Sequence, residues 1–410
     1  MIPDRSTRAL RPLTIAVAGA VSLAIVMGIG RFAFTPMLPM MLADGVIDLK
    51  QGSWLATINL IGYLLGALAC IGLPSFLAGR KRLKLSGAAI IRYSLLATAL
   101  LTLAMASPIS ALWPTLRLLA GIVNAITMVY TAGWCLARLA RAGKPSLGGI
   151  IFTGPGVGIV LSGVVASTST ACRLSSFEAW LVFGALAAVM TALTWRIFQD
   201  DGAAAAPAAT APVSRGGWSA EQWIFAFAYG LAGFGYIITA TFMPVIAREA
   251  LGASPWIDLF WPIFGLAIIC GALLASRIPH HLDLRYLLIG SYVVQAAGVL
   301  MSLLWPTVAG FVLSSILIGL PFTGITHFTM QEARRLSPYR ATSFMALLTA
   351  VYGIGQIAGP PLVGVLLNHT PTHAAGFTLA LQTAFVSLLA GSLLYLFKIR
   401  SFPLAQTKGS

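Results

Sequence analysis

The segment GIGRFAFTPMLP (residues 28–39) has a counterpart in the second half of the chain. This counterpart, GFGYIITATFMP (residues 233–244), has the same length and aligns without a gap, with both glycines and the final proline in register. Glycine lets helix backbones approach closely, and proline kinks or ends a helix. Each copy lies in the first long apolar run of its half, so we interpret the pair as an internal repeat.

At the register position of Arg31 in the first copy, the second copy has Tyr236. A guanidinium inside a membrane span is costly, and such residues generally serve a function. Two explanations remain open for Arg31: it contacts a substrate, or it bonds helix carbonyls as a structural residue.

The composition is that of a protein that crosses a membrane many times. The chain has 410 residues, of which 58% are hydrophobic and only 9% are charged, whereas soluble domains have about 25% charged residues. A span needs about 20 apolar residues. By that measure the sequence predicts twelve spans, near residues 13–41, 53–78, 85–106, 113–137, 147–167, 179–198, 219–247, 257–276, 286–305, 309–331, 342–367 and 376–398.

The spans divide into two groups of six. Residues 199–218 are rich in alanine and proline and have no apolar periodicity, which is typical of a flexible linker. We therefore expect an N-terminal six-helix bundle in residues 1–198 and a C-terminal six-helix bundle in residues 219–410.

The basic residues predict the orientation. Twenty Lys and Arg residues fall on the side that holds both termini and the linker, and three fall on the other side. The positive-inside rule places the termini and the linker in the cytoplasm. The net charge of +15 then reflects basic loops beside anionic lipid rather than nucleic-acid binding.

Four local motifs resemble those of the major facilitator superfamily. RLLAG (residues 117–121) resembles its RxxxG element, and GP pairs recur at residues 154–155 and 359–360, in the fifth and eleventh spans. The loop GLPSFLAGRKR (residues 72–82) resembles the signature loop of the superfamily, although Phe76 stands where the family has an aspartate.

The repeated segments narrow the resemblance to the bacterial YbfB/YjiJ-like subfamily. It implies an all-α membrane protein of the bacterial inner membrane, with twelve transmembrane helices in two pseudo-symmetric halves. It also implies that spans 1, 4, 7 and 10 line a central cavity and that the protein is a transporter.

Polar residues on these spans are candidates for substrate contact. The spacing of Arg117 and Asn124 places them on one face of the fourth span. No Asp or Glu lies deep in any span to neutralise Arg31 and Arg117, and guanidinium groups suit carboxylate oxygens. The predicted substrate-binding set is Arg31, Arg117, Asn124, Tyr236 and Gln356. The alternative for this set is packing between helices. For Arg117 there are two further alternatives: it braces the first span, or its side chain snorkels to the membrane surface.

His327 is the deep residue that titrates near neutral pH, so we expect it to couple transport to protons. The four cysteines form no cluster with histidine, and we expect neither a metal nor a cofactor. A membrane enzyme would need clustered His, Asp, Glu or Cys within the spans, and the sequence has none.

Three functions remain at this stage. The favoured one is a secondary active transporter that moves a small organic solute, expected to be anionic, by alternating access. The others are a passive facilitator of the same fold and a multidrug-type exporter of neutral or cationic compounds. The expected partners are the small-molecule substrate, protons and the lipid bilayer, and the expected state is a monomer. The sequence does not identify the substrate, the direction of transport or the coupling ion.

Overall fold

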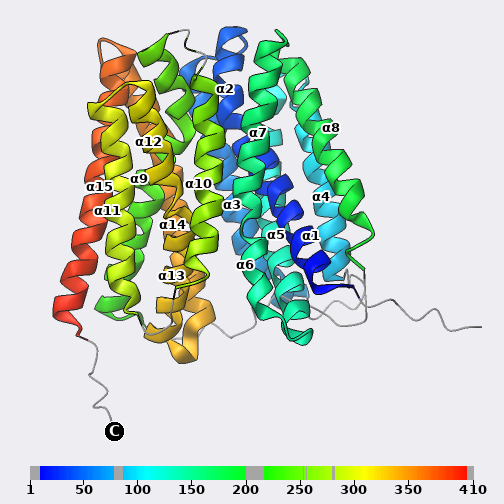
Figure 1. Cartoon of the computed structure of the whole chain (residues 1–410), viewed down its shortest axis with the longest axis vertical. Coiled ribbons are helices and arrows are strands. Elements are labelled where there is room, and N and C mark those ends of the chain that lie inside the picture. Colours follow the sequence, from blue (N-terminus) through cyan, green and yellow to red (C-terminus); the bar gives the residue numbers. More distant parts are fainter. Residues whose placement is uncertain are drawn as a thin grey trace, which may run out of the picture.

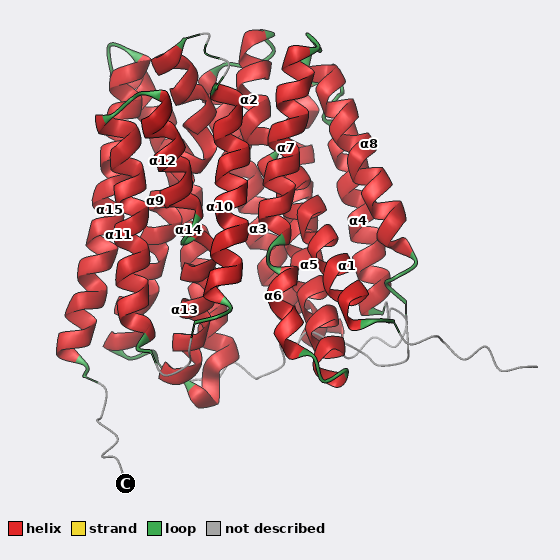
Figure 2. Cartoon of the chain, in the orientation of Figure 1, coloured by secondary structure: helices red, strands yellow, loops and turns green. Residues whose placement is uncertain are grey.

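The computed structural model of the chain describes residues 10–77, 86–199, 217–252, 254, 256–278 and 282–403. In this described part every regular element is a helix (Figure 2). Twelve helical stretches there are long and apolar enough to cross a membrane. The predicted all-helical membrane fold with twelve spans is therefore confirmed.

The six spans of the first half occupy one side of the molecule and the six of the second half the other (Figure 1). The elements of the first half are α1 (Pro12–Leu23), η1 (Ala24–Phe32), α2 (Phe34–Ala43), α3 (Leu49–Leu77), α4 (Gly87–Ala104), η2 (Ser110–Leu112), α5 (Trp113–Arg141), η3 (Pro145–Leu147), α6 (Gly148–Ile151), α7 (Gly154–Ala171) and α8 (Ser176–Trp195). Those of the second half are α9 (Ala220–Leu251), η4 (Ile257–Leu259), α10 (Phe260–Ala275), α11 (Leu284–Leu304), α12 (Val308–Gly319), α13 (Phe322–Leu336), η5 (Pro338–Arg340), α14 (Ala341–His369) and α15 (His373–Ser401).

Helix α1 begins and helix α15 ends at the same end of the bundle (Figure 1). We call this the termini end, and the opposite end, where α2 turns into α3 and α14 into α15, the loop end. The predicted linker falls almost wholly on residues 200–216, which lie outside the described residues. The domain boundaries at residues 198 and 219 therefore stay a prediction.

The start of the second half follows from a local capping signal. The hydroxyl of Ser219 accepts a hydrogen bond from the backbone N–H of Gln222, and the Gln222 side chain accepts one from the backbone N–H of Ser219. This reciprocal pair satisfies two donors that a helix start otherwise leaves unpaired. It begins α9, a helix of 32 residues that is buried over most of its length.

Glycines bring the same pairs of spans together in the two halves. A Cβ added to Gly28 would lie 2.1 Å from the Cα of Gly158, so span 1 and span 5 touch backbone to backbone. In the second half a Cβ on Gly233 would lie 2.4 Å from the carbonyl oxygen of Tyr352, and one on Gly355 would lie 2.1 Å from that of Gly230. Span 7 therefore packs on span 11 as span 1 packs on span 5, which supports the interpretation of an internal repeat.

The first span contains a feature that the sequence did not predict. Its middle third, η1, is a π-helix over nine residues, followed by α2. π-helical turns are rare and frequently lie at functional sites. The corresponding part of span 7 lies within the continuous α-helix α9, so the repeat is broken here in geometry as well as in sequence. Arg31 lies in this π-helical segment.

The halves meet mainly through α3 with α14 and α7 with α10, and also through α2 with α9. The second pair also relies on glycine, because a Cβ on Gly156 would lie 2.7 Å from the carbonyl oxygen of Gly265. Interfaces of small residues allow close contact without large interlocking side chains.

The Gly28 contact generates a stability prediction. The change Gly28→Ala should destabilise the protein by about 1–3 kcal/mol, because the added methyl meets the backbone of Gly158 and forces the helices apart. The control is Gly133→Ala on α5, where a Cβ would meet nothing within 4 Å. Thermal unfolding of the purified variants in detergent measures both effects. Equal melting temperatures for the two variants would show that the close contact contributes nothing to stability.

Candidate functional site

Arg31 lies near the interface of the two halves, is only 6% exposed, and is surrounded by rings. Its Cζ atom lies 5.1 Å from the ring centroid of Phe32 and 4.8 Å from that of Tyr63. Its Nη2 atom is buried and has no hydrogen-bond partner among the described residues. No ion pair between described residues involves Arg31. The guanidinium therefore faces aromatic rings and retains an unused donor, an arrangement that an anion would complete.

Tyr236 and Gln356 approach this region from the second half. The side-chain amide of Gln356 donates a hydrogen bond to the hydroxyl of Tyr236, and both residues are buried. The ring of Tyr236 contacts that of Phe322, which in turn lies beside Phe32, the residue next to Arg31. The structure thus brings together three of the five predicted substrate-binding residues, Arg31, Tyr236 and Gln356.

Stacked tyrosines extend the site along the second half. The ring of Tyr352 stacks on that of Tyr236, with centroids 6.1 Å apart, and on that of Tyr229, with centroids 4.4 Å apart. The hydroxyl of Tyr229 donates a hydrogen bond to Thr326 on α13, 3.2 Å away. A continuous column of rings therefore leads from span 10 to the neighbourhood of Arg31.

Phenylalanine and tryptophan side chains join the halves around the same point. Phe32 lies edge-on to Trp261 and to Phe322, at centroid distances of 6.1 and 6.4 Å. Phe322 in turn lies 5.0 Å from Tyr236. The indole N–H of Trp261, on α10, donates to the hydroxyl of Ser162 on α7 at 3.1 Å. Residues from both halves therefore enclose Arg31 in an aromatic cluster.

Arg117 is already engaged by the protein. Its Nε atom lies 3.5 Å from the carbonyl oxygen of Leu55 and its Nη1 atom 3.4 Å from that of Gly30. Its Cζ atom also lies 4.5 Å from the ring centroid of Phe34. These contacts tie spans 1, 2 and 4 together, which is the bracing role that the sequence left open for Arg117.

Asn124 lies against Gly30 of the first span, inside the first half. A Cβ on Gly30 would lie 2.7 Å from Oδ1 of Asn124 and 2.9 Å from the methyl of Thr98. Asn124 is fully buried, and neither amide atom has a hydrogen-bond partner among the described residues. The face of the fourth span that holds Arg117 and Asn124 therefore packs against the first span.

His327 is exposed on α13, one residue after Thr326. Its Nε2 atom lies 2.6 Å from the side-chain amide nitrogen of Gln331, and its ring contacts that of Phe328.

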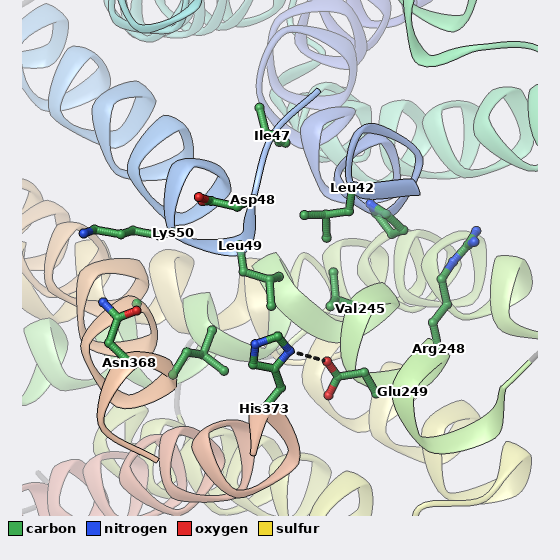
Figure 3. A pocket seen from close by; sticks show the side chains of 13 residues that line it. Leu42, Ile47, Asp48, Leu49, Lys50, Val245, Arg248, Glu249, Asn368 and His373 are labelled. Atoms are coloured by element: carbon green, nitrogen blue, oxygen red, sulfur yellow. Dashed lines mark ion pairs between the residues drawn. The ribbon is translucent and has the colours of Figure 1, made fainter. Parts of the chain in front are cut away.

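A cavity of about 700 Å³ opens at the loop end between the halves. Figure 3 shows its mixed lining, with Asp48 and Lys50 from the first half facing Glu249, Asn368 and His373 from the second. Nδ1 of His373 lies 3.5 Å from a carboxylate oxygen of Glu249. We call this cavity the vestibule.

A buried layer separates the vestibule from Arg31. Pro39 lines the vestibule, and it lies eight residues beyond Arg31 on span 1, about 12 Å along a helix axis. Between them Thr35 donates a hydrogen bond to the carbonyl oxygen of Ala240 at 3.2 Å, which joins the two repeated segments directly. Thr35 is 4% exposed and Ala240 is 2% exposed. Arg31 is therefore closed off from the loop end in this conformation.

Sequence reasoning missed Tyr352, which contacts two members of the column. A usable signal existed, because Tyr352 precedes Gln356 by four residues and so shares its helix face. It also missed a buried charge cluster near the termini end, where Lys398 on α15 bonds Glu332 on α13 at 2.7 Å. Both side chains are almost fully buried, so this pair fixes the packing of the second half.

Twelve membrane-length helices in two packed halves, with a buried cation where they meet, are the architecture of a major facilitator transporter. The family model described as "Uncharacterised MFS-type transporter YbfB" matches residues 23–394, and the chain belongs to that family. The protein is thus a multi-pass membrane transporter and not an enzyme.

A solved structure of the nucleoside transporter NupG, determined as a point mutant, is similar to this chain with a TM-score of 0.70. The likeness covers 94% of this chain and 99% of that chain at 17% sequence identity, and it shows a shared fold. No curated protein matches the chain.

Proposed function

We propose that the protein is a secondary active transporter that moves a small organic anion across the bacterial inner membrane by alternating access. The observation that carries the proposal is the unpaired donor of Arg31, buried among residues from both halves. Burying a guanidinium without an acceptor costs free energy, and an anion would offset that cost. Because Arg31 is closed off from the loop end in this conformation, a ligand reaches it from that end only when the halves move.

The proposed roles differ among the candidate residues. Arg31 holds the negative charge, while Tyr236 and Gln356 orient the rest of the ligand. Arg117 acts through its carbonyl contacts to keep the first span in place, and Asn124 supports the same span from its position beside Gly30. We propose that the monomer is the working unit, because the two halves of a single chain together surround Arg31.

The first test of this proposal is substitution of Arg31. Arg31→Ala should abolish transport of monocarboxylates, and Arg31→Lys should leave a weak activity, because lysine keeps the charge but loses the fork of donors. Uptake of radiolabelled monocarboxylates by proteoliposomes measures both.

The control is Arg92→Ala in α4 of the same half, where the guanidinium lies 5.6 Å from the ring of Trp195, away from this cluster. It should retain wild-type transport. Transport of a permanent cation that is unaffected by Arg31→Ala would refute the anion proposal and favour an exporter of neutral or cationic compounds.

Proton coupling is proposed for His327, which follows Thr326, the hydrogen-bond partner of Tyr229, on span 10. His327→Ala should abolish accumulation driven by a pH gradient and spare counterflow exchange, because exchange needs no net proton movement. Parallel measurements of both in proteoliposomes test this. Wild-type transport that reaches only equilibrium, with or without a protonophore, would instead identify a passive facilitator.

We also propose that the termini end faces the cytoplasm, which the excess of basic residues supports. Single cysteines in a background without native cysteines test it through a membrane-impermeant maleimide applied to intact cells. Asn368→Cys at the vestibule should react, and Gly143→Cys at the termini end should react only after permeabilisation.

The same experiment tests the buried layer. Thr35→Cys should remain unlabelled in the resting protein, because the side chain is buried against Ala240. Labelling of Gly143→Cys in intact cells would reverse the orientation. Labelling of Thr35→Cys as fast as Asn368→Cys would show that the loop end is open.

A further inference from the structure

The environment of Arg31 restricts the kind of anion that the site would accept. Its guanidinium lies beside the rings of Phe32 and Tyr63, and the rings of Phe322, Tyr236 and Tyr352 follow in direct contact with one another. These five rings come from both halves. Phe32 and Tyr236 are fully buried, whereas Tyr63, Phe322 and Tyr352 keep part of their surface exposed. The surfaces next to the charge are therefore mainly aromatic.

The charge count favours a single negative charge. Arg117 already bonds two carbonyl oxygens, and Lys398 is paired with Glu332 near the termini end. Arg31 is thus the one cation of the cluster that lacks an acceptor within the described part of the chain. A dicarboxylate or a phosphate dianion would bring a second charge into a buried site without a partner, which is strongly unfavourable.

The shape of the group follows from the same geometry. A carboxylate that pairs with the fork of an arginine lies in the plane of the guanidinium. A ring joined directly to that carboxylate can stay in or near this plane and meet the partly exposed rings edge-on or offset. Such aromatic pairs contribute beyond the area that they bury. A saturated ring of the same size would fill the space but would lack this contribution.

We infer that the ligand held at Arg31 is an aromatic monocarboxylate, with the carboxylate on Arg31 and the ring against Tyr63, Phe322 and Tyr352. This inference rests on the proposed function. It adds that the body of the anion is flat and unsaturated and that the anion has one charge.

The test compares matched probes on the purified full-length protein in detergent. Benzoate is the aromatic monocarboxylate, cyclohexanecarboxylate its saturated counterpart, benzamide its neutral counterpart and phthalate a dianion. Binding is followed by thermal stabilisation and by tryptophan fluorescence, since Trp261 lies 6.1 Å from Phe32. Benzoate should bind about three- to ten-fold more tightly than cyclohexanecarboxylate, and benzamide and phthalate should bind more weakly than either.

Variants assign the preference to the rings. Tyr352→Leu should remove the advantage of benzoate over cyclohexanecarboxylate, and Tyr352→Phe, which keeps the ring and the packing, should retain it. The control is Tyr286→Leu, an exposed tyrosine on α11, which should change nothing. If Tyr352→Leu does not fold, loss of the advantage in Tyr63→Leu, with its retention in Tyr63→Phe, supports the same conclusion.

The outcomes separate this inference from the proposed function. Equal binding of benzoate and cyclohexanecarboxylate, with both abolished by Arg31→Ala, would overturn the aromatic preference and leave the anion transporter standing. Absence of benzoate binding would also overturn the inference. Binding of benzamide or of the neutral nucleoside uridine, unchanged by Arg31→Ala, would overturn both.

Discussion

The contact between the backbones of Gly28 and Gly158 is the constraint from which the site follows. Because no side chain separates spans 1 and 5 there, the first span is fixed in position where its backbone becomes π-helical. Arg31 comes three residues after Gly28, within the same π-helical segment. The carbonyl oxygen of Gly30, between them, accepts from Arg117 and so ties this segment to span 4. Backbone packing thus determines where the buried charge lies.

The internal repeat accounts for most of the architecture, and the difference between Arg31 and Tyr236 at matching positions accounts for the site. Glycines join span 1 to span 5 and span 7 to span 11 in corresponding ways. At the matching position of the two segments, however, one half has a cation and the other has Tyr236, which carries a hydrogen-bonded hydroxyl. The two halves are similar in structure but present different chemical groups at the centre. The site can therefore bind the two ends of a ligand by different interactions.

The sequence predicted the spans and the repeat because hydrophobic length and glycine spacing are local properties. It singled out Arg31 as a candidate for a related reason, since a charge within an apolar run is visible in the sequence whichever way the side chain points. The sequence could not show whether the polar face of span 4 lines a cavity or packs against another helix. Arg117 and Asn124 lie on that face, and either environment would be consistent with polar residues there. Contacts to Gly30 and Leu55, distant in sequence, resolve that choice. The π-helix depends on tertiary contacts and likewise has no local signal.

The way in which Arg31 is held bears on how binding could drive transport. In this conformation its neighbours are ring faces, and cation–π contacts contribute only about 0.5–2 kcal/mol each. A ligand can shift a conformational equilibrium only by its difference in affinity for the two states. If an internal carboxylate held Arg31, an incoming anion would first have to displace it and would gain little. Because the described residues around Arg31 supply rings and no counter-ion, almost the whole interaction with an anion is free to favour the state in which the halves close around it.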